Sequence, residues 1–232
     1  QVKTLQKLLD KFNIPQVSKE GFEADDVLGT LSKKLNDKGK EVMIVTGDRD
    51  SFQLITDKTN ILYTKRGISD TQIFNEKQFN EKYSIKTNQY IEYLALKGDP
   101  SDNIPGLPGV GEKTAINLLL KYKNISNIYQ NIDDLTPKLK ETFSVNRNLL
   151  DISKTLATIK QDLEIDIPET KTTETIFLDD SVLNKAEDEI SKYELSRFLG
   201  VRNFKVKDKP KQEIEIEIFS KKIKDESLIF NY

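Results

Sequence analysis

The chain has 232 residues, with 36 Lys and Arg against 38 Asp and Glu, and its net charge is −2. It contains no cysteine and no histidine, which excludes disulfides, zinc–thiolate sites, histidine metal sites and serine–histidine catalytic pairs. Any metal must therefore be held by oxygen ligands, which favours Mg²⁺, Mn²⁺ or Ca²⁺. The near-neutral charge gives no global sign of nucleic-acid binding, and no apolar run is long enough to span a bilayer.

The front of the chain predicts an α/β layer. Leucines at helical spacing predict helices over residues 2–12 and 24–38, and the second ends at Gly39. The short β-branched run at 42–45 predicts a buried parallel strand. Residues 61–63 and 72–74 are weaker strand candidates on either side of a turn at Gly67, and a helix is expected at 88–97. Residues 1–97 are therefore expected to form a mostly parallel sheet with flanking helices.

The second half of the chain has a different pattern. Residues 98–111 are rich in Gly, Pro, Asp and Ser and predict a long ordered loop. Only helices are predicted beyond it, at 113–122, 146–159 and 183–198, so residues 98–204 are expected to form a helical subdomain. Residues 205–212 read as a charged linker. Residues 213–232, in which Glu and Ile alternate at first, predict a tail or the start of a further domain.

Seven carboxylates fall in three short clusters at the ends of predicted elements. The clusters are Glu23, Asp25 and Asp26; Asp48 and Asp50; and Asp99 and Asp102. Each cluster has an ordinary alternative explanation, namely favourable placement at a helix N-terminus, an Asp cap before a helix, or capping of a turn. The middle pair follows the buried strand at its carboxyl end, where ligands bind in open α/β sheets. If the fold brings the clusters together, their repulsion requires cations, and two such ions support in-line phosphoryl displacement.

The stretch from 104 to 119 is the most specific part of the sequence. Its glycines permit a tight hairpin with outward-facing N–H groups, and a helix begins directly after it. Such a helix N-terminus is a phosphate site that grips a backbone without reading bases. The spacing of a Walker loop is absent, and a plain interhelical turn is the alternative. The stretch resembles a helix–hairpin–helix element, whose candidate DNA-binding residues are Gly106, Gly109, Val110, Gly111, Lys113 and Thr114.

Three motifs together resemble a known family. They are GFEADDVLGTL at 21–31, VTGDRDSFQLI at 45–55 and LALKGDPSDNIPGLPGVGEKTA at 94–115. In order and spacing they are similar to the 5′–3′ exonuclease domain of bacterial DNA polymerase I, a 5′-nuclease of PIN-like fold, and less closely to flap endonucleases. The resemblance runs to about residue 204, including residues 157–167 and 192–199.

The resemblance implies a function and a set of site residues. All seven carboxylates would bind two Mg²⁺ or Mn²⁺ ions, with Asp26, Asp48 and Asp50 as the catalytic residues, and K⁺ would bind at the helix–hairpin–helix. The substrate would be DNA with a 5′ flap, a nick or an RNA primer, cut during replication and repair. The resemblance also implies a monomeric bacterial cytoplasmic protein, with no membrane association and with polymerase domains covalently downstream.

The chain departs from this family at its front. Family domains begin with a strand carrying a catalytic Asp, a second Asp-bearing segment and a basic helical arch. This chain starts at the following helix with Gln1, and its only methionine is Met43. We therefore expect an N-terminally truncated piece that is inactive or nearly so by itself. A non-catalytic helix–hairpin–helix module that binds duplex DNA is the alternative, whereas a calcium-binding protein lacks the EF-hand loop spacing it would need.

Overall fold

A computed structural model describes residues 2–12, 14–67, 69–167, 184, 186–192 and 228–230. It divides into two compact units, one made of Gln1–Ser18 and Pro168–Glu226 and the other of Lys19–Ile167 and Ser227–Tyr232. The first unit contains helices α1 (Val2–Lys11) and α10 (Glu187–Lys192), which lie within the predicted helices 2–12 and 183–198. The predicted linker 205–212 lies outside the described residues, and so does the Glu–Ile alternation at the start of the predicted tail 213–232.

The second unit contains a four-stranded sheet of order β3-β2-β1-β4. The strands are β1 (Val42–Thr46), β2 (Thr59–Arg66), β3 (Asp70–Phe74) and β4 (Leu228–Phe230). Strand β1 pairs in parallel with both β2 and β4, which confirms the mostly parallel sheet. Strand β3 runs antiparallel to β2 because only a short turn, with Gly67 at a φ of 58°, joins them. Strand β4, which was not predicted, pairs with β1 on the side opposite β2.

Helix α2 (Ala24–Asp37) packs against β1. Its leucines recur at helical spacing, and Leu28, Leu31 and Leu35 are all buried, as the pattern predicts. The helix ends where Gly39 adopts a φ of 77°, a left-handed conformation that glycine takes without strain. The buried face of α2 thus covers β1, and its first turn carries Asp25 and Asp26.

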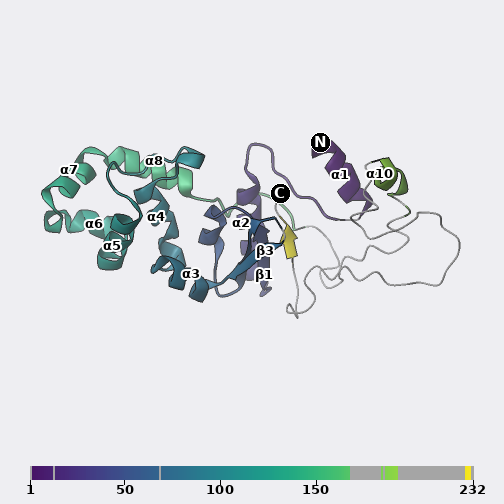
Figure 1. Cartoon of the computed structure of the whole chain (residues 1–232), viewed down its shortest axis with the longest axis horizontal. Coiled ribbons are helices and arrows are strands. Elements are labelled where there is room, and N and C mark those ends of the chain that lie inside the picture. The colour runs from purple at the N-terminus through teal and green to yellow at the C-terminus, as the bar shows by residue number, and fades with distance from the viewer. Residues whose placement is uncertain are drawn as a thin grey trace. The chain divides into compact units, whose positions relative to one another are not determined.

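Helices make up the rest of the second unit, and Figure 1 shows α5 to α8 grouped away from the sheet. They are α3 (Glu76–Tyr83), α4 (Tyr90–Lys97), α5 (Glu112–Tyr122), α6 (Ile125–Gln130), α7 (Pro137–Val145) and α8 (Arg147–Ala157). Short 3₁₀ turns lie between these helices at η2 (Thr87–Gln89), η3 (Pro100–Asp102) and η4 (Ile132–Asp134), and a further one, η1 (Asp50–Leu54), lies between β1 and β2. The helix predicted at 146–159 runs two residues past the observed C-terminal end, because α8 ends at Ala157 and Thr158 is extended.

Aromatic side chains join the sheet to the helical part. Phe52, in η1, is fully buried, and its ring centroid lies 4.7 Å from that of Phe74 in β3 and 6.2 Å from that of Phe79 in α3. The ring of Tyr90, at the start of α4, lies 6.1 Å from Phe52. Aromatic pairs of this kind add to the burial of apolar area. The packing of Phe52 therefore holds the η1 turn in place, and with it Asp50, the first residue of that turn.

Within the described ranges, no helix combines the length and the apolar character needed to cross a membrane.

Candidate metal centre and backbone-binding hairpin

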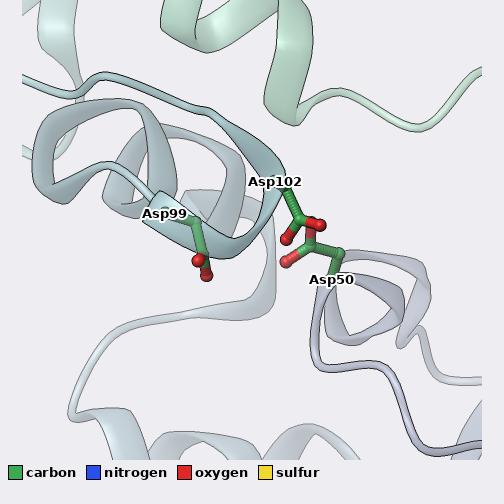
Figure 2. Close-up of side chains that lie close together, drawn as sticks. All are labelled: Asp50, Asp99 and Asp102. Atoms are coloured by element: carbon green, nitrogen blue, oxygen red, sulfur yellow. The ribbon is translucent and has the colours of Figure 1, made fainter.

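Three carboxylates from two distant parts of the sequence meet in the structure. Asp50, Asp99 and Asp102 each offer an oxygen, and these oxygens all lie within 4.8 Å of one another. Figure 2 shows the side chains of Asp50 and Asp102 pointing toward each other from separate loops, with Asp99 on the same turn as Asp102. Asp50 begins η1 just beyond the carboxyl end of β1, whereas Asp99 is the N-cap of η3 and Asp102 is its last residue. We call these three residues the acidic cluster.

The turn that carries Asp99 and Asp102 is closed by its own backbone. Asp99 N–H donates to the Ile104 carbonyl at 2.9 Å, and Ile104 N–H donates back at 2.8 Å. The Asp99 carboxylate accepts hydrogen bonds from the N–H and the hydroxyl of Ser101, at 3.0 and 2.6 Å. Asp99 therefore performs the turn-capping role weighed from the sequence, and it also faces the acidic cluster.

Two glycines allow the closed turn to form. Gly98 and Gly106 have φ angles of 78° and 66°, and a methyl group on Gly106 would lie 2.5 Å from the Gly98 nitrogen. The backbone segments on either side of the turn thus approach more closely than any side chain permits. The positions of Asp99 and Asp102 follow from this contact.

The acidic cluster is electrostatically unfavourable without cations. Burial, followed by the charges of Asp48, Asp102, Asp99 and Asp25, raises the pKa of Asp50 to about 7. The Ser101 hydroxyl works in the other direction on Asp99 and lowers its pKa. Across the described residues, no Lys or Arg lies within ion-pair distance of a cluster carboxylate. Lys97 and Arg49 also lower the pKa of Asp99 through their charges, but neither forms an ion pair with the acidic cluster.

The geometry of the acidic cluster fits a hard divalent cation. Mg²⁺ and Ca²⁺ bind oxygen at roughly 2.0 to 2.6 Å, so two oxygens on one ion lie at most about 4 to 5 Å apart. The oxygens of the acidic cluster all lie within 4.8 Å of one another, which is about that limit. Carboxylate oxygens are also the ligands that such ions prefer. Asp50, Asp99 and Asp102 could therefore share one ion with little movement.

The other four predicted ligands lie outside the 4.8 Å group. Glu23 is the N-cap of α2, and its N–H donates to the Asp26 carboxylate at 3.4 Å. The other oxygen of Asp26 accepts from the backbone N–H of Lys160 at 2.8 Å. Asp48, which is exposed, accepts from the N–H of Asp50 at 2.9 Å. Asp25 is close enough for its charge to raise the pKa of Asp50.

Two basic side chains lie beside the η1 turn over aromatic rings. Arg49, between Asp48 and Asp50, donates to the Tyr63 hydroxyl at 3.2 Å. The ammonium of Lys82 lies 5.0 Å from the centre of the Phe74 ring. Partial burial, and then repulsion from Arg49, lowers the pKa of Lys82, so the two cations lie in the same neighbourhood. The sequence analysis did not single out either residue.

The glycine hairpin is only partly available to a ligand. Gly106 and Val110 are buried, and the Gly106 N–H donates to the Ser153 hydroxyl at 3.0 Å. The prediction of outward-facing N–H groups is therefore wrong for Gly106, because α8 supplies an internal acceptor. Gly109, Gly111 and Lys113 are exposed, and Thr114 is half-buried.

The N-terminus of α5 follows directly on this hairpin. The first helical hydrogen bond in α5 runs from Ala115 N–H to the Gly111 carbonyl. Among the described residues, no acceptor is bonded to the N–H groups of residues 112–114, and Gly111 supplies no side-chain cap. Free N–H groups at an exposed helix start suit a phosphate.

An extended segment after α8 runs along α2, and the sequence analysis missed its role. The N–H of Ile159 donates to the Gln53 side chain at 2.9 Å, and that of Leu163 donates to the Thr30 hydroxyl at 3.2 Å. Lys34 donates in turn to the carbonyl of Ile165. We call residues 158–165 the strap. Alternate burial of Ile159, Leu163 and Ile165 is a period-two signal that could have revealed it.

Two family models and a set of curated relatives match this chain. Residues 1–84 match the family model "5'-3' exonuclease, N-terminal resolvase-like domain", and residues 85–176 match "5'-3' exonuclease, C-terminal SAM fold". DNA polymerase I of Bacillus subtilis is 41% identical over 168 residues, which are 72% of this chain and 19% of the relative. DNA polymerase I of Bacillus caldotenax is 36% identical over 213 residues, 91% of this chain and 23% of the relative.

A solved structure is similar in fold. It is the flap endonuclease of bacteriophage T5 in a pseudo-enzyme–product complex with DNA and metal ions, with a TM-score of 0.56 and 25% identity. The match covers 64% of this chain and 54% of the phage protein.

The chain spans about a fifth of the length of the polymerase relatives it matches. The two family models together cover residues 1–176 in order, and this chain belongs to the 5′–3′ exonuclease family.

Proposed function

We propose that this chain forms the metal-binding and DNA-gripping part of a structure-specific 5′ nuclease. One observation carries the proposal: three carboxylates lie within 4.8 Å of one another, and no Lys or Arg of the described residues forms an ion pair with them. The substrate is DNA with a 5′ flap, a nick or an RNA primer, and the reaction is phosphodiester hydrolysis in replication and repair. The DNA and metal ions bound by the phage relative, and the DNA polymerase I relatives, support this substrate class.

Two divalent ions, Mg²⁺ or Mn²⁺, are the proposed cofactors. Asp50, Asp99 and Asp102 would hold one ion directly. The remaining predicted ligands, which are Glu23, Asp25, Asp26 and Asp48, would contribute to the second. When bound, such ions lower the pKa of an attacking water and neutralise the leaving oxygen.

The side chains of this chain then have defined tasks. Asp50 must be ionised to act as a ligand, so metal binding competes with the proton that the metal-free cluster favours. Asp48 fixes the turn through its hydrogen bond to the Asp50 N–H, and Asp26 fixes α2 against the strap. Arg49 and Lys82 would contact substrate phosphates beside the cluster, where their positive charge has no carboxylate partner among the described residues.

The hairpin before α5 would hold the duplex at a distance from the chemistry. The exposed N–H groups at the start of α5, together with Lys113 and Thr114, would bind one strand through its phosphates. A K⁺ ion at the hairpin is part of this proposal. Such contacts carry no base specificity, which suits an enzyme that recognises the structure of a DNA end.

The domain context, oligomeric state and location proposed for the nuclease are based on its DNA polymerase I relatives. Polymerase domains would lie covalently downstream, and the protein would work as a monomer in the bacterial cytoplasm. The alternative function is a non-catalytic helix–hairpin–helix module that binds duplex DNA and needs no divalent ion.

A pair of measurements on Asp102→Asn tests the proposal. Mn²⁺ binding by the 232-residue chain should weaken at least about tenfold, because the variant removes one ligand charge. Duplex binding in EDTA should be unchanged, because the hairpin is untouched. A chain that binds duplex DNA but takes up no Mn²⁺ at these carboxylates would support the non-catalytic module instead. Asp48→Asn in the complete nuclease domain should abolish cleavage of a 5′ flap and spare binding; cleavage at the parent rate would refute its catalytic role.

A further inference from the structure

All three acid-bearing segments are hydrogen-bonded to one continuous stretch of chain, residues 153–163. The turn with Asp99 and Asp102 is bonded through Gly106 N–H to the Ser153 hydroxyl at 3.0 Å. The η1 turn with Asp50 is bonded through Gln53, and the start of α2 is bonded through Asp26 to Lys160. No two of these segments are adjacent in the sequence.

Gln53 uses every polar atom of its side chain in this connection. Its amide nitrogen donates to the carbonyl of Asp50 at 3.0 Å and to that of Ala157 at 2.9 Å. Its amide oxygen accepts from Ile159 N–H at 2.9 Å. One side chain thereby joins the Asp50 turn to the end of α8 and to the first part of the strap.

Ser153 makes the matching connection on the other side. It is fully buried, and its hydroxyl oxygen accepts from the N–H of Gly106, which is also buried. Ser153 and Ala157 are four residues apart, so they lie on one face of α8, separated by about 6 Å along its axis.

We infer that Gln53 and Ser153 are positioning residues, which hold the two halves of the acidic cluster at metal-binding separation by fastening both to the C-terminal half of α8. This inference rests on the proposed function, since it assumes that the acidic cluster binds a metal ion. Neither residue is a ligand. Each acts through the loop backbone, as residues beyond the immediate ligands do in metal sites, where their loss commonly weakens binding about 10- to 100-fold.

Gln89 provides a matched control. Its amide nitrogen donates to the carbonyls of Leu119 and Lys123, at 3.1 and 2.7 Å, and its oxygen accepts from Lys86 N–H at 2.9 Å. The bonding pattern is that of Gln53, with two carbonyl acceptors and one N–H donor. Its partners are Leu119 in α5, Lys123 just after α5 and Lys86 just before η2. Gln89→Met therefore removes an equivalent set of hydrogen bonds, none of which joins an acid-bearing segment.

The experiment measures Mn²⁺ affinity by titration of the 232-residue chain, with unfolding followed in parallel. Gln53→Met, which keeps the length of the side chain, should raise the Kd for Mn²⁺ about tenfold. Ser153→Ala should shift the Kd in the same direction. Gln89→Met should leave the Kd unchanged. Its melting temperature should fall by about as much as that of Gln53→Met.

The outcomes separate this inference from the function on which it rests. If the parent chain binds Mn²⁺ and Gln53→Met binds it as tightly as Gln89→Met does, Gln53 is merely structural and the inference is wrong. If the parent chain binds no Mn²⁺ at the acidic cluster, the proposed function fails, and the positioning role fails with it. A selective loss of affinity in Gln53→Met and Ser153→Ala supports both.

Discussion

The Asp26 carboxylate accepts a hydrogen bond of 2.8 Å from the backbone N–H of Lys160, a residue 134 positions later in the chain. Asp26 is also a predicted metal ligand and catalytic residue. A single carboxylate can serve both purposes, because each of its oxygens accepts more than one partner.

Two substitutions at Asp26 separate these purposes. Asp26→Asn keeps an oxygen acceptor for Lys160 N–H, so the free energy of unfolding should change by less than about 0.5 kcal/mol. Asp26→Ala removes the acceptor and should cost about 1 kcal/mol. Both should weaken Mn²⁺ binding if Asp26 is a ligand. Urea unfolding and metal titration of the two variants check these expectations, and equal stability of both would show that the bond to the strap is unimportant.

Asp50 should make the metal-free protein less stable as the pH rises. Its pKa is about 7 in the folded chain, against an ordinary value of 3.8, so the folded state holds a proton that the unfolded state releases. The resulting stabilisation is complete below pH 3.8 and is lost as the pH rises to about 7. Asp50→Asn cannot ionise and should therefore be more stable than the parent at pH 8 and similar to it near pH 4.

Unfolding in EDTA at pH 4, 6 and 8 measures this difference. Addition of Mg²⁺ at pH 8 should stabilise the parent chain and not the variant, which reverses the order. A stability difference that does not vary with pH would mean that Asp50 does not carry the repulsion of the acidic cluster.

Gly106→Ala should disrupt the turn of the acidic cluster. The new methyl group would lie 2.5 Å from the Gly98 nitrogen, in a backbone conformation with a φ of 66°. We expect a loss of at least about 3 kcal/mol, from strain and overlap with backbone that cannot move. Gly109→Ala is the control, because its φ is 75° but no atom lies within 4 Å of the new carbon. It should cost about 1 kcal/mol, and a similar cost for both variants in urea unfolding would contradict the close approach.

Lys113→Ala should weaken duplex binding equally for all sequences. Loss of one phosphate contact should reduce the slope of log K against log salt concentration by about 0.9. Lys121 is an exposed lysine in the last turn of the same helix, and Lys121→Ala should leave that slope unchanged. Fluorescence titrations with two unrelated duplexes at several salt concentrations test this. An effect confined to one sequence would count against a backbone contact.

The sequence predicted best where one periodic pattern decides the structure. Helix α2 and strand β1 have apolar residues at the spacing of their own elements, and both lie where they were expected. Helix α3 was missed because only Phe79 and Tyr83 are buried in it, and its start depends on the Asn75 side chain, which accepts from two backbone N–H groups. Strand β4 could not be predicted, since it pairs with a strand far earlier in the chain.

The acidic cluster was predicted in part. Asp50, Asp99 and Asp102 were named as candidate ligands, and the structure brings these three together. The hydrogen-bonding partners of Asp26 and Gly106 come from residues 160 and 153, so no local pattern could show that their polar atoms are engaged. The roles of Gln53 and Ser153 depend on the same long-range contacts and left no sign in the motifs.

The strap also has a consequence for the order in which the protein assembles during translation. Asp26 and Thr30 of α2 accept hydrogen bonds from backbone N–H groups that lie 134 and 133 residues later in the chain. These bonds cannot form until the ribosome has added those residues. At about 5 to 20 residues per second, the delay lasts roughly 7 to 27 seconds. A nascent chain thus carries both loops of the acidic cluster before α8 and the strap emerge, so the spacing of these carboxylates is fixed only after that later segment has been made.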